Sequence, residues 1–361
     1  MTTLPPVDEM IRAYQASDPS YDGIFFLGVR TTGIFCRPSC RARKPYPHNV
    51  EFFASAQEAI FAGYRPCKRC HPLDLGALPS WASDLLREVE TDPALRLKDE
   101  DLRARGLDPA SVRRFFLKRY GQTFHAYARA RRLGSAFAAL QRGAPLDDAA
   151  LGYGYESHSG FREAFARLFG QAPGQSRSAD CIVVAWLDTP LGPMVAGATR
   201  AGLCLLDFTD RAVLEAQFAA LQRHFACAIV PGHNQHLAQA QTQLTQYFAG
   251  ERRAFDLPLV LSGTPFQEQV WRALLTIPYG ESLSYHDLAG RVGVANAQRA
   301  VGQANGANRI AIVVPCHRVV NQRGQLGGYG GGLWRKRLLL DLERGQRVFT
   351  QPQPALLGRS F

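Results

Sequence analysis

A chain of 361 residues is too long for a single ordinary hydrophobic core, and an apolar content of 46% argues against extensive disorder. Lys and Arg outnumber Asp and Glu by 42 to 31, and this net charge of +11 favours a polyanionic partner, because each neutralised phosphate releases counterions. No apolar run approaches the roughly 18 residues of a membrane-spanning helix, and residues 1–8 lack the features of a signal peptide. We therefore expect a cytoplasmic protein of several domains that has no membrane partner.

Four of the 8 cysteines lie in two close pairs, Cys36 with Cys40 and Cys67 with Cys70. Two such pairs, separated by about one supersecondary unit, are typical of a small domain that holds zinc in a tetrahedron of thiolates. Two disulfides are the alternative, which a reducing compartment disfavours. We expect residues 1–75 to form a module with one Zn²⁺ held by these four cysteines.

Basic residues surround the predicted zinc ligands. They are Arg37, Arg41, Arg43, Lys44, Arg65, Lys68 and Arg69. Some of them could offset the charge of a zinc ion with four thiolates, 2 − 4 = −2, or simply form a solvated surface. The excess of cations beyond that need favours contact with phosphate.

Residues 81–178 have a helical pattern with an internal repeat. The segment that begins at Val112 is matched by one that begins at Phe161, 161 − 112 = 49 residues later. Each copy has an N-cap residue, a closing glycine and a shorter preceding helix that ends in glycine: Asp108, Gly121 and Gly106 in the first copy, and Ser157, Gly170 and Gly154 in the second. This predicts two helix-turn-helix motifs, with an ordinary helical bundle as the alternative. Arg113 and Arg162 would lie on the outward faces of their recognition helices and bind DNA.

Residues 181–262 predict a small α/β unit. Strands are expected at residues 182–187, 191–196 and 202–208, and a helix at residues 212–225. We expect this unit to have a structural role only.

Residues 263–349 predict a winged-helix-like layout. Thr264 and Ser284 are N-caps of two helices, and a third helix at about residues 296–304 carries Arg299. A strand at residues 310–314, a glycine-rich loop at residues 327–332 and a last helix at residues 336–343 complete the unit.

The predicted strand at residues 310–314 delivers the most reactive group of the chain. Pro315 ends the strand because proline has no N–H to donate, and Cys316 follows at the end of this rigid element. Adjacent residues of an extended chain point to opposite sides, so we expect His317 to act on the sulfur through a water molecule. Glu343 is a candidate acid to orient the imidazole, and its alternative is a solvent-facing position. A cysteine hydrolase pair is another interpretation, although such residues are usually distant in the sequence.

Several of these segments resemble known families. Residues 315–320 (Pro-Cys-His-Arg-Val-Val), Arg299-Ala300-Val301-Gly302 upstream, and Tyr329 and Glu343 downstream are similar to the O6-alkylguanine-DNA alkyltransferases. Residues 31–40 and 65–70 resemble the zinc module of the Ada family, as does the order of the domains. The resemblance implies a multidomain α/β and α fold: a zinc module, an AraC-type double helix-turn-helix, a ribonuclease H-like α/β unit and an alkyltransferase domain.

The resemblance also implies an activity and its residues. Cys316 would irreversibly accept the methyl group of O6-methylguanine, and of O4-methylthymine, and Cys36 that of a DNA methylphosphotriester. Asn308 would support the active site and Arg299 would fill the space left by the extruded base. Matching positions further imply DNA contacts by Thr32, Arg41, Arg43, Arg65 and Tyr285.

Methylation of Cys36 would switch the protein into a transcriptional activator. Its partners would be alkylated and promoter DNA and, in the methylated form, RNA polymerase, and we expect a monomer associated with the nucleoid. The sequence has no dinucleotide-binding or P-loop signature, so we expect no organic cofactor. The alternative is an AraC-type transcription factor with a purely structural zinc ion and an inactive alkyltransferase domain.

Overall fold

The structure is a computed structural model that describes residues 4–73, 79–120, 122–173, 180–211, 213–322 and 324–346. The chain divides into two compact units, residues 1–79 with 328–337 and residues 80–327 with 338–361. Within the described residues, no helix combines the length and the apolar character needed to cross a bilayer.

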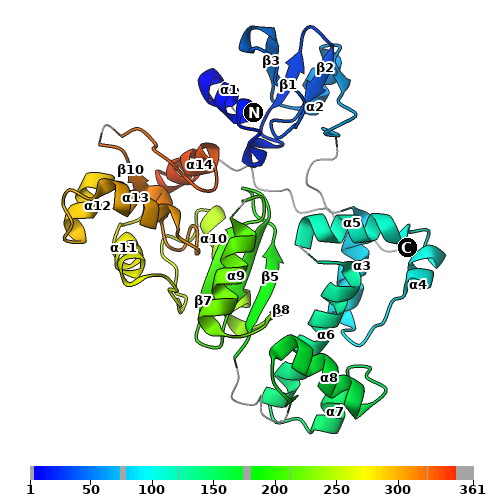
Figure 1. Cartoon of the computed structure of the whole chain (residues 1–361). Helices are drawn as coiled ribbons and strands as arrows, with labels where there is room; N and C mark the ends of the chain where they lie inside the picture. Colours follow the sequence, from blue (N-terminus) through cyan, green and yellow to red (C-terminus); the bar gives the residue numbers. More distant parts are fainter. Residues whose placement is uncertain are drawn as a thin grey trace. The chain divides into compact units, whose positions relative to one another are not determined.

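The first unit is built on a four-stranded sheet in the order β3-β1-β2-β4 (Figure 1). Its elements are α1 (Val7–Gln15), η1 (Pro19–Tyr21), β1 (Phe26–Val29), β2 (Ile34–Cys36), η2 (Pro47–Asn49), β3 (Val50–Phe53), α2 (Ala56–Phe61) and β4 (Arg65–Pro66). Phe26, Phe35 and Phe53 form its core with Ala59 of α2. The parallel pairing of β2 with β4 aligns Phe35 with Pro66, so each strand leads into one of the two cysteine pairs at the same end of the sheet.

The second unit begins with six helices. They are α3 (Ser80–Thr91), α4 (Asp99–Ala104), α5 (Pro109–Tyr120), α6 (Phe124–Gln141), α7 (Leu146–Leu151) and α8 (His158–Phe169). The two predicted helix-turn-helix motifs are confirmed as α4–α5 and α7–α8. Asp108 accepts hydrogen bonds from the N–H groups of Ala110 and Ser111, and Ser157 accepts one from Gly160. Gly106 and Gly154 both have a φ of 74°, a backbone conformation that glycine adopts without strain, whereas Gly121 lies outside the described residues.

The α/β part of the second unit is a four-stranded sheet in the order β7-β6-β5-β8 (Figure 1). Its elements are β5 (Ile182–Leu187), β6 (Met194–Ala198), β7 (Leu203–Phe208), α9 (Leu214–Phe225), β8 (Ile229–Pro231) and α10 (Gln235–Phe248). The three expected strands and the first helix are present, while β8 and α10 were not predicted. All six residues of β7 are buried, which shows that both faces of this edge strand are covered.

The last part of the second unit carries the predicted Cys-His pair. Its elements are α11 (Pro265–Leu275), β9 (Leu283–Ser284), α12 (Tyr285–Arg291), α13 (Gln298–Gly306), η4 (Cys316–Arg318), β10 (Val319–Val320) and the end of α14 (Leu333–Glu343). The expected N-caps are confirmed, because Thr264 accepts a hydrogen bond from the N–H of Gln267 and Ser284 one from that of Asp287. Helix α14 begins at Leu333, three residues before the predicted start, 336 − 333 = 3.

The strand predicted at residues 310–314 is wrong. Ile310 makes an isolated bridge to Leu206, and the chain then turns, with a φ of 70° at Ile312 and a hydrogen bond from the N–H of Val314 to the carbonyl of Ile310. Burial of these residues was predicted correctly, but a buried apolar run cannot by itself distinguish a strand from a compact turn. The small sheet of this region is instead the parallel pair β9–β10.

Candidate active site and metal centre

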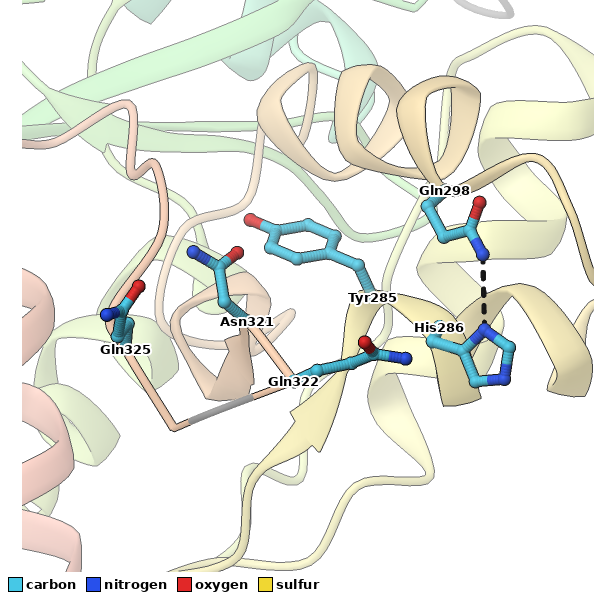
Figure 2. A pocket seen from close by; sticks show the side chains of 6 residues that line it. All are labelled: Tyr285, His286, Gln298, Asn321, Gln322 and Gln325. Atoms are coloured by element: carbon cyan, nitrogen blue, oxygen red, sulfur yellow. Dashed lines mark hydrogen bonds between the residues drawn. The ribbon is translucent and has the colours of Figure 1, made fainter.

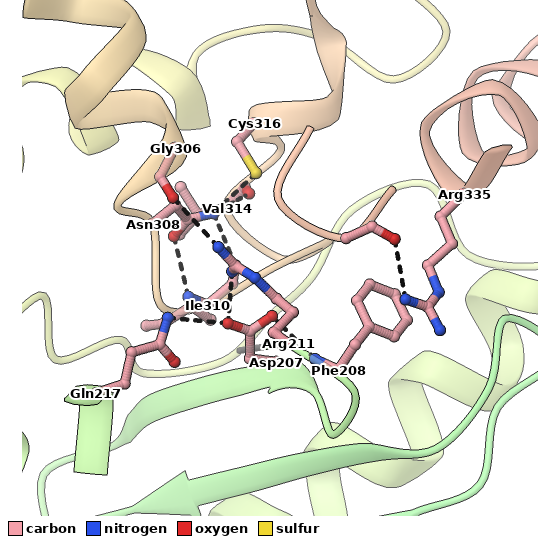
Figure 3. Close-up of polar contacts among 11 residues, drawn as sticks. Asp207, Phe208, Arg211, Gln217, Gly306, Asn308, Ile310, Val314, Cys316 and Arg335 are labelled. Atoms are coloured by element: carbon pink, nitrogen blue, oxygen red, sulfur yellow. Dashed lines mark hydrogen bonds and ion pairs between the residues drawn. The ribbon is translucent and has the colours of Figure 1, made fainter. Parts of the chain in front are cut away.

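Cys316 is the first residue of η4 and is only 6% exposed. The side chain of Asn308, on the loop after α13, donates from Nδ2 to the Cys316 sulfur at 3.2 Å and to the carbonyl of Val314 at 2.9 Å (Figure 3). Asn308 Oδ1 accepts from the N–H of Ile310 at 3.0 Å. One amide therefore organises the turn and places a donor on the sulfur, where it can stabilise developing negative charge.

His317 and Glu343 lie in direct contact in the protein interior. His317 Nε2 is 2.9 Å from Glu343 Oε1, and both side chains are fully buried. The solvent-facing alternative for Glu343 is thus wrong. The premise that residues 316 and 317 are extended is also wrong, because η4 is a 3₁₀ turn.

Two side chains that the sequence analysis did not select also contact Glu343. Arg318 donates from Nε to Oε2 at 2.8 Å and from its NH2 group to Oε1 at 2.9 Å, and the Tyr247 hydroxyl donates to Oε1 at 2.8 Å. Burial raises the pKa of Glu343, but the hydrogen bonds and charges of His317 and Arg318 outweigh that effect and hold it below its usual range. Glu343 is therefore a carboxylate, acceptor-only, at neutral pH. Arg318 follows His317 directly and could have been chosen from the motif, whereas Tyr247 lies on the unpredicted helix α10.

A cavity of about 450 Å³ lies beside α12 (Figure 2). It is lined by Tyr285, His286, Gln298, Asn321, Gln322 and Gln325. Gln298 Nε2 and His286 Nδ1 are 3.1 Å apart, which ties α13 to α12. Tyr285 lines this cavity, and burial and the nearby Cys316 raise its pKa. Arg299, the next residue on α13, is exposed.

The four clustered cysteines form a site that fits a metal ion. Their sulfur atoms all lie within 4.8 Å of one another, and all four residues are buried free thiols. Tetrahedral zinc with bonds of about 2.3 Å needs sulfurs about 3.8 Å apart, a separation that lies within this limit. The alternative of two disulfides is wrong.

Cations around this cluster fall into two groups. Arg37 Nε lies 3.4 Å from Asp22 Oδ2, and Lys44 Nζ donates to the carbonyl of Cys40 at 2.6 Å. Both cations therefore stabilise the local structure around the cysteines. Four residues predicted to bind DNA are all exposed: Thr32, Arg41, Arg43 and Arg65. The three arginines of this second group are open to solvent, as is Thr32.

Arg113 on α5 and Arg162 on α8 are exposed at equivalent places in the two helix-turn-helix motifs. Arg113 also lines a cavity of about 430 Å³ together with Asp99, Arg129 and other residues. Arg113 is therefore exposed on α5 and lies on the same cavity wall as the carboxylate of Asp99.

Four family models match consecutive parts of the chain. They are "Metal binding domain of Ada" at residues 9–73, "Helix-turn-helix domain" at residues 103–179, "6-O-methylguanine DNA methyltransferase, ribonuclease-like domain" at residues 182–261 and "6-O-methylguanine DNA methyltransferase, DNA binding domain" at residues 265–345.

Curated relatives match either nearly the whole chain or its C-terminal part. "Bifunctional transcriptional activator/DNA repair enzyme Ada" of Escherichia coli is 35% identical over 349 residues, 93% of this chain and 96% of that protein. "Regulatory protein ada" of Salmonella typhimurium is 37% identical, with 93% of this chain and 96% of that protein covered. "Methylated-DNA--protein-cysteine methyltransferase" of Mycobacterium bovis is 46% identical over 160 residues, 44% of this chain and 91% of that protein.

Proposed function

Since this chain belongs to the Ada family of bifunctional transcriptional activators and DNA repair enzymes, we propose that Cys316 and Cys36 are two separate, single-use acceptors of methyl groups from alkylated DNA. The chain is a methylated-DNA–protein-cysteine methyltransferase that carries a helix-turn-helix regulator. The observation that carries the proposal is the buried sulfur of Cys316, with the donor Asn308 on one side and the His317–Glu343 pair on the adjacent residue.

Cys316 would react with O6-methylguanine and, by the same chemistry, with O4-methylthymine. The methyl group lies inside the duplex, so the base must first leave the stack at a cost of a few kcal/mol. The polar cavity beside Tyr285 is a suitable place for the hydrogen-bonding edge of the extruded base. Exposed Arg299 is suited to fill the space that the base leaves in the duplex. Tyr285 would press on the phosphate of the extruded nucleotide.

The transfer itself is a displacement at carbon. The thiolate forms the S–C bond as the C–O bond breaks, and the electron pair of that bond goes to the guanine oxygen as the base gains a proton. Because Glu343 only accepts hydrogen bonds, His317 Nε2 carries the proton of the neutral ring, which makes Nδ1 the basic nitrogen. His317 Nδ1 would take the thiol proton through a water molecule, and this proton balances the one gained by guanine. The resulting thioether is stable, so one molecule repairs one base.

Cys36 would accept the methyl group of a methylphosphotriester. Its sulfur would bond the methyl carbon as the C–O bond breaks, and the electron pair would leave with the phosphodiester anion. Cys36, Cys40, Cys67 and Cys70 would hold one zinc ion, which keeps its sulfur ligands anionic at neutral pH. Methylation turns the Cys36 thiolate into a thioether and removes one negative charge from the cluster, so its repulsion from DNA phosphates decreases. Exposed Thr32, Arg41, Arg43 and Arg65 would then hold the backbone.

This charge change is the proposed regulatory switch. The methylated protein would bind promoter DNA through α5 and α8, with Arg113 and Arg162 among the contacts, and would recruit RNA polymerase. A single copy carries every group named here, so we propose a monomer without an organic cofactor. A protein whose substrate is chromosomal DNA works beside the nucleoid, which is the cytoplasmic location that we propose.

Mass spectrometry of the full-length protein tests both acceptors. One duplex carries O6-methylguanine and another carries a methylphosphotriester; each should add one methyl group, on the Cys316 peptide and the Cys36 peptide respectively. Cys316→Ala and Cys36→Ala should each abolish one addition only, and Cys181→Ala, at a buried cysteine just before β5, should abolish neither. Unmodified thiols in the wild-type protein would refute the proposal.

A transcription assay tests the switch. Cys36→Ala protein with zinc retained should fail to activate its promoter after methylating damage, while it still repairs O6-methylguanine. Normal induction by this variant would overturn the switch and leave the repair proposal intact.

A further inference from the structure

The α/β sheet holds the loop that carries Asn308. Leu206 of β7 donates from its N–H to the carbonyl of Arg309 at 2.8 Å, and its carbonyl accepts from the N–H of Ala311 at 2.7 Å. These two bonds fix the chain on the C-terminal side of Asn308. The sheet edge is thus continuous with the active-site loop.

The next residue of β7, Asp207, is a fully buried carboxylate. Its Oδ2 accepts from Gln217 Nε2 of α9 at 2.9 Å and from Arg211 at 2.5 Å, and its Oδ1 accepts from the N–H of Phe208 (Figure 3). A buried ion pair contributes little net stability compared with apolar residues of the same size, because both charges lose their hydration. Its presence is better explained by the geometry that it imposes.

Arg211 extends this pair to the helix that precedes Asn308. Its second guanidinium arm donates to the carbonyl of Gly306 at 3.4 Å, at the last residue of α13. That carbonyl is one of those that a helix end leaves without an intrahelical partner, and a cation is favourable there. The chain is therefore held on both sides of Asn308, by Arg211 at residue 306 and by Leu206 at residues 309–311.

We propose that Arg211, oriented by Asp207 and Gln217, is a positioning residue for methyl transfer: it fixes the end of α13 so that the Asn308 amide stays on the Cys316 sulfur. The proposal rests on the proposed role of Cys316 as methyl acceptor. It gives the α/β part, for which the sequence predicted only a structural role, a direct effect on the reactivity of the thiol. Looser placement of the Asn308 donor weakens the hydrogen bond that stabilises negative charge on the Cys316 sulfur, so less thiolate would be available at neutral pH.

Two variants separate positioning from folding. Arg211→Lys keeps a cation for Asp207 but lacks the second arm for Gly306. Asp207→Asn with Arg211→Met removes both charges together, so no buried charge is left unpaired. Arg252→Lys is the matched control, because Arg252 bonds to Gln246 and Ala254 within the same α/β part.

The readout is the pH profile of the single-turnover rate on a duplex with one O6-methylguanine, measured with the full-length protein. Burial raises the pKa of Asp207 to about 6, against the opposing effects of Arg211 and Gln217, so the profile is recorded above that value, where the pair is charged. The titratable groups nearest the sulfur, Tyr285 of α12 and His317 with its partner Glu343, are unchanged in every variant.

Both pair variants should move the midpoint of the profile up by about one pH unit, which is about a tenfold lower rate at neutral pH that recovers in alkali. Their affinity for unmodified duplex should equal that of the wild type, and Arg252→Lys should reproduce the wild-type profile. A folded Arg211→Lys protein with an unshifted midpoint would overturn the inference, as would a rate lowered equally at every pH. If the wild-type protein itself gains no methyl group on Cys316, the proposed function fails instead.

Discussion

Arg318 and Glu343 form a two-armed ion pair in the interior of the second unit, with Nε 2.8 Å from Oε2 and the NH2 group 2.9 Å from Oε1. The side chains are 8% and 0% exposed. Paired contacts of this kind fix both position and orientation. Because the same carboxylate binds His317, the arginine that follows the histidine also sets the direction of the imidazole.

Glu343→Gln should destabilise the protein and slow methyl transfer to Cys316. The substitution leaves Arg318 charged and buried without a counter-ion, which costs about 3–5 kcal/mol of unfolding free energy. Urea denaturation and single-turnover kinetics measure the two effects. Asp341→Asn, on the same helix but without a contact to His317, should change neither. Equal stability of Glu343→Gln and wild type would contradict the role of this pair.

Tyr247→Phe should have a smaller effect of the same kind. It removes one hydrogen bond to Glu343 while it keeps the ring, so the loss should be about 0.5–1.5 kcal/mol. Thermal unfolding measures this loss. Tyr46→Phe, at a tyrosine that is 67% exposed, is the control and should leave the stability unchanged. A loss as large as that of Glu343→Gln would mean that the tyrosine does more than donate this bond.

At low pH, Glu343 should lose its contribution to the stability of the folded protein. Its folded-state pKa lies below the usual value of about 4.3, so its contribution to stability is complete above that pH and is lost as the pH falls toward the folded-state value. The difference in unfolding free energy between wild type and Glu343→Gln should therefore shrink below about pH 4. Denaturation curves recorded at several pH values measure it, and a gap that stays constant in acid would count against the assignment.

Asn308→Ala should slow the reaction at Cys316 by roughly 10- to 100-fold at neutral pH, because the sulfur loses a positioned donor. The loop should also be destabilised, since the carbonyl of Val314 and the N–H of Ile310 lose their partner. Single-turnover kinetics test the first effect. Gln303→Ala, on the exposed face of α13, should behave as wild type. A reaction rate unchanged by Asn308→Ala would remove the amide from the mechanism.

Removal of zinc by a chelator should affect the two acceptors differently. Methyl uptake at Cys36 should stop, because structural zinc sites lose their order without the metal, while uptake at Cys316 should continue. Peptide mass spectrometry after reaction with each substrate measures both. Renewed uptake at Cys36 after Zn²⁺ is added back is the control, and simultaneous loss of both activities would contradict the independence of the sites.

Local signals explain which parts of this structure could be predicted. An N-cap such as Ser157 and a glycine such as Gly154 act within one helical turn. The two helix-turn-helix motifs can therefore be predicted from residues that are close together in the sequence. The four-cysteine site is similar, since two short-range pairs need only one strand pairing to meet. The run at residues 310–314 carries no such local signal, because strand and turn bury the same apolar side chains.

By itself, the sequence determined the two helix-turn-helix motifs, the N-caps at Thr264 and Ser284, and the pairs of cysteines that form the cluster. Only the tertiary structure decided that Tyr247 meets Glu343, 96 residues away, and that Asp207 and Arg211 hold the loop of Asn308. The reason is physical: hydrogen bonds and ion pairs of buried groups depend on which side chains packing brings within about 3 Å, and no periodicity along the chain encodes that distance.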